Sequence, residues 1–187
     1  FAPDLTDDTA PLTLFTKVAA QLNVNRDRTL TFGLDAAANN LKQTGESLIN
    51  FYRTITRHYP LTYLEDPFGE EDLTPFRQLK KELRGKVTIV GDDLTTTDPK
   101  IIAAPAFKDA VGGVIIKPDQ IGTVTETLAA VHAGRANGWQ IFVSHRSGET
   151  NDDFIADLAY GLGADGIKLG APARGERVAK YNRLLEI

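Results

Sequence analysis

Short apolar runs rich in β-branched residues recur along the chain, and each ends in a polar or charged residue. They cover residues 30–34, 61–64, 87–91, 114–116, 139–143 and 166–169. The first five are followed by Asp35, Glu65, Asp92, Lys117 and Ser144, and the sixth contains Lys168; these six residues follow one another at intervals of 24 to 30 positions. Runs that are apolar throughout are typical of strands buried on both faces of a parallel sheet.

The segments between these runs have the apolar spacing of helices. They predict helices over residues 10–22, 47–57, 123–136, 151–162 and 174–185, and another that begins at Thr74-Pro75. The apolar residues expected to face inward are Phe76, Leu79 and Leu83, then Val124, Leu128 and Val131, then Phe154, Ile155 and Leu158. Strands that alternate with helices at this interval indicate parallel strands joined by right-handed crossovers, and so an α/β fold.

Two α/β architectures suit this pattern, a doubly wound open sheet and a (β/α)8 barrel. The glycine fingerprint of a dinucleotide-binding sheet does not follow the first strand. Polar residues close nearly every strand, as in a TIM-type barrel, whose sites form at the C-terminal strand ends. Only about six βα units fit in the 187 residues, whereas a whole barrel takes about 250. We therefore predict an incomplete TIM-type barrel forming one domain over residues 1–187.

Composition narrows the function classes. Apolar residues make up 42% and charged residues 25%, which is typical of a globular protein. The net charge of -4 argues against binding to nucleic acid. No apolar run is long enough to span a membrane, and the absence of cysteine excludes thiolate metal sites and fits a reducing compartment. Because the chain contains no methionine and begins at Phe1, we expect further sequence upstream.

Three carboxylates, Asp35, Glu65 and Asp92, end successive predicted strands. In a barrel these ends converge, and three carboxylates brought together repel one another unless a cation lies between them. Oxygen ligands with room for water and substrate suit Mg²⁺. A single acid at a strand end is as readily explained as a cap for the next helix. Three in succession favour a metal site.

Two lysines close later strands. Lys117 shares a strand face with Ile115, and Lys168 faces opposite to Ile167 and Leu169. A lysine near a divalent cation is a candidate base, because the cation disfavours its ammonium form. Either lysine alone is better explained as extending from the rim into solvent. The basic stretch over residues 174–183 is expected to be a solvated final helix.

A polar loop, Ser144-His145-Arg146-Ser147-Gly148-Glu149, follows the fifth predicted strand. Arginine and hydroxyl groups are the donors that phosphate recognition needs. An ordinary polar loop would have a similar composition.

Several segments, in this order along the chain, resemble the enolase family. They are Tyr63-Leu64-Glu65-Asp66-Pro67-Phe68, Val90-Gly91-Asp92-Asp93-Leu94-Thr95, Ile115-Ile116-Lys117-Pro118-Asp119-Gln120, Ser144-His145-Arg146-Ser147-Gly148-Glu149-Thr150, Ile167-Lys168-Leu169-Gly170-Ala171-Pro172 and Glu176-Arg177-Val178-Ala179-Lys180-Tyr181-Asn182. The resemblance extends from Phe1 to the last helix, and the fourth segment is highly specific. It implies an enolase-type barrel and a cytoplasmic, magnesium-dependent lyase of glycolysis that interconverts 2-phosphoglycerate and phosphoenolpyruvate.

The resemblance also implies roles for single residues. Asp35, Glu65 and Asp92 would hold Mg²⁺, with Glu65 and Asp92 also lying at the substrate. Lys117 would be the catalytic base, Lys168 would balance the charge of the substrate carboxylate, and Asp93 would lie near Lys117. Ser144, His145, Arg146 and Ser147 would form the substrate loop, with Arg146 on the phosphate. The substrate is a small molecule, and the full-length protein is expected to be a homo-oligomer.

Two features differ from the family pattern. Enolases have an N-terminal domain with a lid, and an acidic residue just before the segment that matches Phe1, so we expect the 187 residues alone to be inactive. The segment between Asp35 and Glu65 is also shorter than is typical of the family.

Two alternatives to a lyase of this kind stay open at this point: another enolase-superfamily enzyme that acts on a different carboxylate, and a non-catalytic binding protein that retains the scaffold.

Overall fold

A computed structural model of the chain describes residues 4–5, 7–24, 30–41, 45–83 and 85–187. The chain divides into two compact units, Phe1–Thr88 and Ile89–Ile187. The expectation of a single domain over residues 1–187 stays a prediction.

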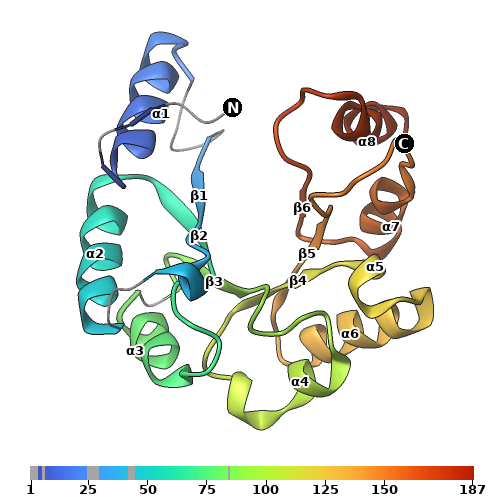
Figure 1. The fold of residues 1–187 in the computed structure, drawn as a ribbon, viewed down its shortest axis with the longest axis horizontal. Helices are drawn as coiled ribbons and strands as arrows, with labels where there is room; N and C mark the ends of the chain where they lie inside the picture. Colours follow the sequence, from blue (N-terminus) through green and yellow to red (C-terminus); the bar gives the residue numbers. More distant parts are fainter. Residues whose placement is uncertain (1–3, 6, 25–29, 42–44, 84) are drawn as a thin grey trace. The chain divides into compact units, whose positions relative to one another are not determined.

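In the first unit, helices and strands alternate along the chain (Figure 1). The elements are α1 (Ala10–Gln21), β1 (Phe32–Asp35), the 3-10 helix η1 (Ala38–Asn40), α2 (Gly45–His58), β2 (Leu61–Glu65) and α3 (Leu73–Leu83). The strands β1 and β2 are parallel and bring Asp35 into register with Glu65. Two carboxylates therefore end neighbouring strands, as the sequence predicts.

Aromatic rings fill the core of this unit beside α2 and α3. The Tyr52 ring lies edge-on to Phe68 with 5.7 Å between centroids, and Phe68 lies edge-on to Phe76 at 5.3 Å. All three side chains are almost fully buried. The buried Tyr52 hydroxyl donates a hydrogen bond to the Pro67 carbonyl at 2.9 Å, which satisfies its polar end. This bond fixes the chain two residues beyond Glu65.

The second unit is a parallel sheet, in the order β3-β4-β5-β6, with helices between the strands (Figure 1). Its elements are β3 (Thr88–Gly91), α4 (Pro99–Ala103), η2 (Pro105–Phe107), β4 (Gly113–Ile116), α5 (Pro118–Ile121), α6 (Val124–Ala136), β5 (Gln140–Ser144), α7 (Phe154–Leu162), β6 (Gly166–Lys168) and α8 (Gly175–Glu186). All side chains of β4 are buried, as expected of a strand covered on both faces.

Helix α6 lies very close to the sheet at Gly134. A Cβ atom added at Gly134 would be 2.9 Å from Ile141 Cδ1 and 3.1 Å from Val114 Cγ1. Glycine at this position lets the helix approach β4 and β5.

The structure confirms the α/β class and the position of each predicted strand to within two or three residues. Helix α7 begins at Phe154 rather than at residue 151, because the Asp152 carboxylate accepts a hydrogen bond from the Phe154 amide and forms a turn before the helix. The short helices η1, α4, η2 and α5 were not predicted. No helix within the described residues is long and apolar enough to cross a membrane.

Some expected inward faces are wrong. Phe76, Leu79, Leu83 and Val131 are buried as predicted, but Val124 is 49% exposed and Phe154 is 42% exposed. The buried positions of α6 and α7 are instead mostly small residues, among them Ala130, Gly134 and Ala156. Small side chains let these helices lie close to the sheet, so the larger residues are left at the edge of the contact.

Candidate functional site

Four of the predicted site residues lie at the C-terminal ends of neighbouring strands in the second unit. Asp92 follows β3, Lys117 follows β4, and Ser144 and Lys168 end β5 and β6. The strands are parallel, and Ser144 is in register with Lys168. The sheet therefore brings these residues to one edge, where α/β proteins place their sites.

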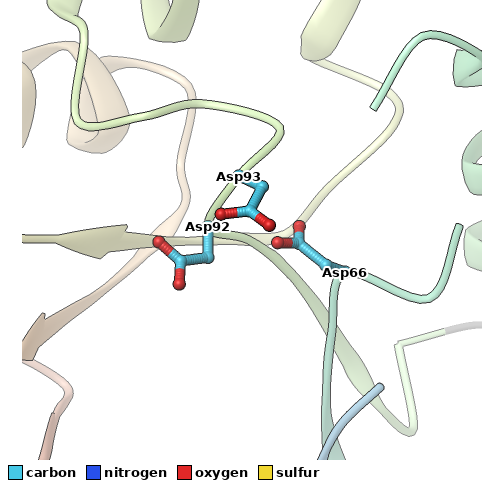
Figure 2. Close-up of side chains that lie close together, drawn as sticks. All are labelled: Asp66, Asp92 and Asp93. Carbon is cyan, nitrogen blue, oxygen red and sulfur yellow. The ribbon is translucent and has the colours of Figure 1, made fainter. Parts of the chain in front are cut away.

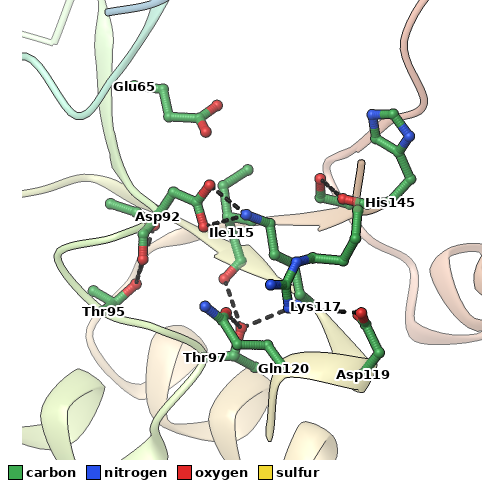
Figure 3. A network of polar contacts seen from close by, with 12 residues as sticks. Glu65, Asp92, Thr95, Thr97, Ile115, Lys117, Asp119, Gln120 and His145 are labelled. Carbon is green, nitrogen blue, oxygen red and sulfur yellow. Dashed lines mark hydrogen bonds and ion pairs between the residues drawn. The ribbon is translucent and has the colours of Figure 1, made fainter. Parts of the chain in front are cut away.

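The Lys117 side chain donates hydrogen bonds to both carboxylate oxygens of Asp92, at 2.7 Å to Oδ1 and 2.5 Å to Oδ2 (Figure 3). Both side chains are mostly buried, with exposed fractions of 13% for Lys117 and 12% for Asp92. Charge-assisted hydrogen bonds in such a place hold both groups in a defined position. The predicted base is thereby fixed to one of the predicted metal ligands.

Thr97 supports Lys117 from the backbone side. Its hydroxyl oxygen accepts a hydrogen bond from the Lys117 amide at 3.0 Å and lies 3.1 Å from Gln120 Oε1, to which it can donate (Figure 3). Thr97 is fully buried and has a left-handed backbone, with φ of 57°. Strain of this kind persists only where the surroundings impose it, and it is common near functional sites. Sequence reasoning missed Thr97, since a threonine in a polar segment gives no distinctive signal.

The loop after β5 is fixed at its start. The His145 amide donates a hydrogen bond to the Lys168 carbonyl at 3.0 Å, and the buried Ser144 hydroxyl donates to the His145 carbonyl at 2.9 Å. The loop then becomes exposed at Arg146 and Ser147. The predicted phosphate-binding groups are therefore accessible to solvent, while the residues before them are held by the sheet.

Arg146 lies near an acidic side chain of another strand end. Its Nη1 is 3.6 Å from Asp119 Oδ2, and both side chains are substantially exposed. Asp119 belongs to α5, which directly follows Lys117. This ion pair connects the loop after β5 to the segment after β4.

The surroundings of His145 lower the pKa of its imidazole. Burial is the main reason that the pKa of His145 is lowered from 6.5, and the charge of Arg177 lowers it further; Glu149 acts in the opposite direction. Its Nδ1 atom is buried without a hydrogen-bond partner among the described residues. A neutral imidazole with an unused nitrogen can still donate to or accept from a ligand.

The other predicted metal ligands belong to the first unit. The Glu65 side chain is fully buried, and its Oε2 accepts a hydrogen bond from the Tyr63 hydroxyl at 2.5 Å. Asp35, its partner in register, is exposed. A buried carboxylate beside a second one needs compensating donors or a cation.

Two further aspartates follow the predicted ligands directly. Figure 2 shows Asp93 beside Asp92 on the segment after β3, and Asp66 on the segment after β2. Asp66 is buried with a left-handed backbone, φ 38°, whereas Asp93 is exposed. All of these donors are carboxylate oxygens, which hard cations such as Mg²⁺ prefer. The residues present thus fit a magnesium ion in their chemistry.

One sequence interpretation was wrong in part. The basic stretch over residues 174–183 was expected to be solvated, but the Lys180 side chain on α8 is only 1% exposed. Two of its partners are residues of the loop after β5, about thirty positions earlier in the chain, and the third is the Glu176 carbonyl on α8 itself. Contacts of such long range leave no signal in the local pattern of the sequence.

Comparison with known proteins gives a consistent result over the whole chain. Residues 7–187 match the family described as "Enolase, C-terminal TIM barrel domain". The chain is 41% identical to the enolase of Aeropyrum pernix over 198 aligned residues and 40% identical to that of Saccharolobus solfataricus over 201, covering 100% of the chain in both cases. It is 44% identical to the enolase of Sulfurisphaera tokodaii over 169 residues, covering 84% of the chain.

The alignments cover 46%, 47% and 40% of these relatives, so the chain spans about half the length of the curated relatives it matches. The match and the six strands, parallel within each unit, confirm the prediction of part of an enolase-type TIM barrel. The family model matches residues 7–187, and two relatives are about 40% identical over the whole of the chain. The chain therefore belongs to the enolase family and corresponds to the C-terminal TIM-barrel domain of that family.

Proposed function

We propose that the protein carrying this chain is a magnesium-dependent carbon–oxygen lyase that interconverts 2-phosphoglycerate and phosphoenolpyruvate in glycolysis. The observation that carries the proposal is the contact between Lys117 and Asp92 at the C-terminal edge of the sheet, at 2.7 and 2.5 Å. It joins a candidate base to a candidate metal ligand within a member of the enolase family.

In this proposal Lys117 removes the proton from the carbon beside the substrate carboxylate. An unprotonated Nζ takes the proton, and the electron pair of the C–H bond moves onto the carboxylate, which gains negative charge. The hydroxyl group on the next carbon then leaves as water, which requires a proton from a general acid. Asp92 and Thr97 hold Lys117 in place, through its side chain and its backbone amide respectively.

The remaining residues bind substrate or position the groups that bind it. Arg146 and Ser147, both exposed on the loop after β5, provide phosphate donors, and Ser144 and His145 support that loop. Lys168, at the end of β6, offsets the charge that develops on the carboxylate. Asp93 follows Asp92 and shapes the surroundings of Lys117.

Asp35, Glu65 and Asp92 are the proposed magnesium ligands, with Glu65 and Asp92 also at the substrate. When bound, Mg²⁺ would stabilise the negative charge that develops on the substrate carboxylate. The same proposal includes a cytoplasmic location and a homo-oligomeric full-length protein.

The test measures phosphoenolpyruvate formation from 2-phosphoglycerate by the full protein that carries this chain, in the presence of Mg²⁺. Lys117→Ala is expected to lower the rate by a factor of about 10²–10⁴ or more and to stop exchange of the substrate's α-proton with deuterated water. Lys100→Ala, which changes an exposed lysine on α4, is the matched control. Near-normal exchange in Lys117→Ala would assign the proton transfer to another group, and absence of phosphoenolpyruvate formation by the unmodified protein would refute the proposed function.

A further inference from the structure

Helix α8 carries a lysine whose whole side chain is buried. Lys180 is 1% exposed and is among the largest fully buried side chains of the described residues. Lysine is almost never buried to this extent unless its amino group has partners, because removing a charge from water is costly. The atoms that contact the Lys180 amino group therefore indicate its role.

Three oxygen atoms surround the Lys180 amino group. It donates hydrogen bonds to the Thr150 carbonyl at 2.5 Å and to the Glu176 carbonyl at 2.7 Å, and it lies 3.5 Å from Glu149 Oε2. An ammonium group has three donors and no acceptor, so this set matches its capacity. Two of the three acceptors belong to the end of the loop that follows β5.

The loop is therefore fixed at both ends. At its start, the His145 amide is bonded to the Lys168 carbonyl of β6 at 3.0 Å. At its far end, Glu149 forms an ion pair with Lys180 of α8, and the Thr150 carbonyl accepts a hydrogen bond from the same amino group. Between these two points lie Arg146 and Ser147, which are exposed. Arg146 also has an exposed partner, Asp119, at 3.6 Å, so the two buried ends are the firmer supports of this part of the loop.

We propose that Lys180 is a positioning residue for phosphate recognition, which holds Arg146 and Ser147 in place by binding Glu149 and Thr150. This inference rests on the proposed function, since it assigns Lys180 a part in binding the substrate phosphate. It acts through the loop and does not touch substrate. Because small displacements of a binding group lower kcat/KM strongly, the loss of this anchor reduces activity at a distance from the chemistry.

The contact requires the shape of lysine as well as its charge. Methionine has a similar length and no charge, so Lys180→Met leaves the Glu149 carboxylate without its cation. Arginine retains the charge but is planar and presents its donors in a rigid fork, so it does not reproduce the two hydrogen bonds and the ion pair of Lys180 in a closely packed position. The activity of Lys180→Arg should therefore lie between that of Lys180→Met and that of the unmodified protein.

The first readout is kinetic, in the full protein. Lys180→Met is expected to raise KM for 2-phosphoglycerate about tenfold or more and to lower kcat/KM by a factor of about 10–100, with a smaller effect on kcat. Glu149→Gln should change KM in the same direction by less. Because the two residues share one contact, the double variant should resemble Lys180→Met alone. Arg183→Gln is the matched control, since it removes an ion pair between α8 and Asp157 of α7 without touching the loop.

The second readout does not depend on enzymatic activity. Trypsin cleavage after Arg146 requires the loop to open, and its rate, followed by mass spectrometry, reports how firmly the loop is held. Lys180→Met and Glu149→Gln should be cleaved there several times faster than the unmodified protein and Arg183→Gln, with no faster cleavage after Lys100 on α4. This result would separate release of the loop from general loosening of the unit.

The outcomes distinguish the two proposals. An unmodified protein without lyase activity refutes the proposed function, and with it the catalytic part of this inference, while the cleavage rates still decide whether Lys180 anchors the loop. If Lys180→Met does not fold, Glu149→Gln decides by the same two readouts. Unchanged KM and unchanged cleavage after Arg146 in Glu149→Gln and in a folded Lys180→Met would overturn the inference. Equal acceleration of cleavage after Lys100 and Arg146 would assign Lys180 a purely structural role.

Discussion

Lys117 and Asp92 come from the ends of neighbouring strands, 25 positions apart in sequence, and both carboxylate oxygens of Asp92 accept hydrogen bonds from the Lys117 amino group. The contact is mostly shielded from solvent. In the proposed mechanism, Asp92 both holds the base Lys117 in position and binds the magnesium ion. A change in the Asp92 carboxylate should therefore affect metal binding and proton transfer together.

The first prediction follows from this double role. Asp92→Asn should lower the affinity of the full protein for Mg²⁺ at least tenfold, measured by calorimetry, because an amide lacks the charge of a carboxylate ligand. It should also slow exchange of the substrate's α-proton. Asp109→Asn, at an exposed position of the same unit, should leave both unchanged. Unaltered magnesium binding in single variants of Asp35, Glu65 and Asp92 would contradict the proposed ligand set.

Much of this edge of the sheet could be predicted from the sequence. Strands buried on both faces leave uninterrupted apolar runs, so β3, β4 and β5 and the polar residues that end them were located from the pattern alone. The buried faces of α6 and α7 were predicted only in part: Val131 is buried as expected, but Gly134, which approaches the sheet, and the buried Ala156 add nothing to an apolar pattern. The roles of Thr97 and Lys180 depend on partners 20 or more positions away, which a local reading of the sequence does not show.

The second prediction concerns the ion pair between Arg146 and Asp119. Asp119 competes with an incoming phosphate for Arg146 and repels it, so Asp119→Asn should lower KM for 2-phosphoglycerate. The pair is 3.6 Å apart and exposed, and pairs of this kind contribute up to about 1 kcal/mol, which limits the gain to about fivefold. The gain should shrink as the salt concentration rises, because exposed charges are screened. A higher KM in Asp119→Asn would mean that Asp119 holds Arg146 in its binding position instead.

The third prediction concerns the protonation of His145. Burial and the charge of Arg177 lower its pKa, so Arg177→Gln should raise the pKa of His145 toward 6.5, and Glu149→Gln should lower it further. NMR titration of the imidazole measures both changes, with Arg183→Gln as the control. A pKa of His145 that stays the same in Arg177→Gln would show that the charge of Arg177 does not lower it.

The same shift makes stability depend on pH. The folded protein resists protonation of His145, whereas the unfolded chain takes up the proton near pH 6.5. The free energy of unfolding should therefore fall as the pH drops from about 6.5 toward the lower pKa of the folded state. His145→Gln should remove this part of the pH dependence, measured by denaturant titration between pH 7 and pH 5.

The last prediction compares two glycines in helices of the second unit. Alanine favours a helix over glycine by up to about 1 kcal/mol, so the packing around each position decides the outcome. At Gly161 of α7 nothing lies within 4 Å of an added Cβ, and Gly161→Ala should stabilise the protein by about 0.5–1 kcal/mol. At Gly134 the added Cβ would meet Ile141 Cδ1 at 2.9 Å in the buried core, and overpacking of this kind costs about 1–3 kcal/mol.

Gly134→Ala should therefore destabilise the protein, and a smaller side chain at Ile141 should compensate in part. Ile141→Val removes Cδ1 and costs about 0.5–1.5 kcal/mol alone. Combined with Gly134→Ala it should cost less than the sum of the two single changes, because it removes the closer of the two atoms that the new Cβ meets, while Val114 Cγ1 at 3.1 Å remains. Denaturant unfolding of the four variants and the unmodified protein measures these differences. Additive effects, or a Gly134→Ala variant as stable as Gly161→Ala, would show that α6 can move away from the sheet.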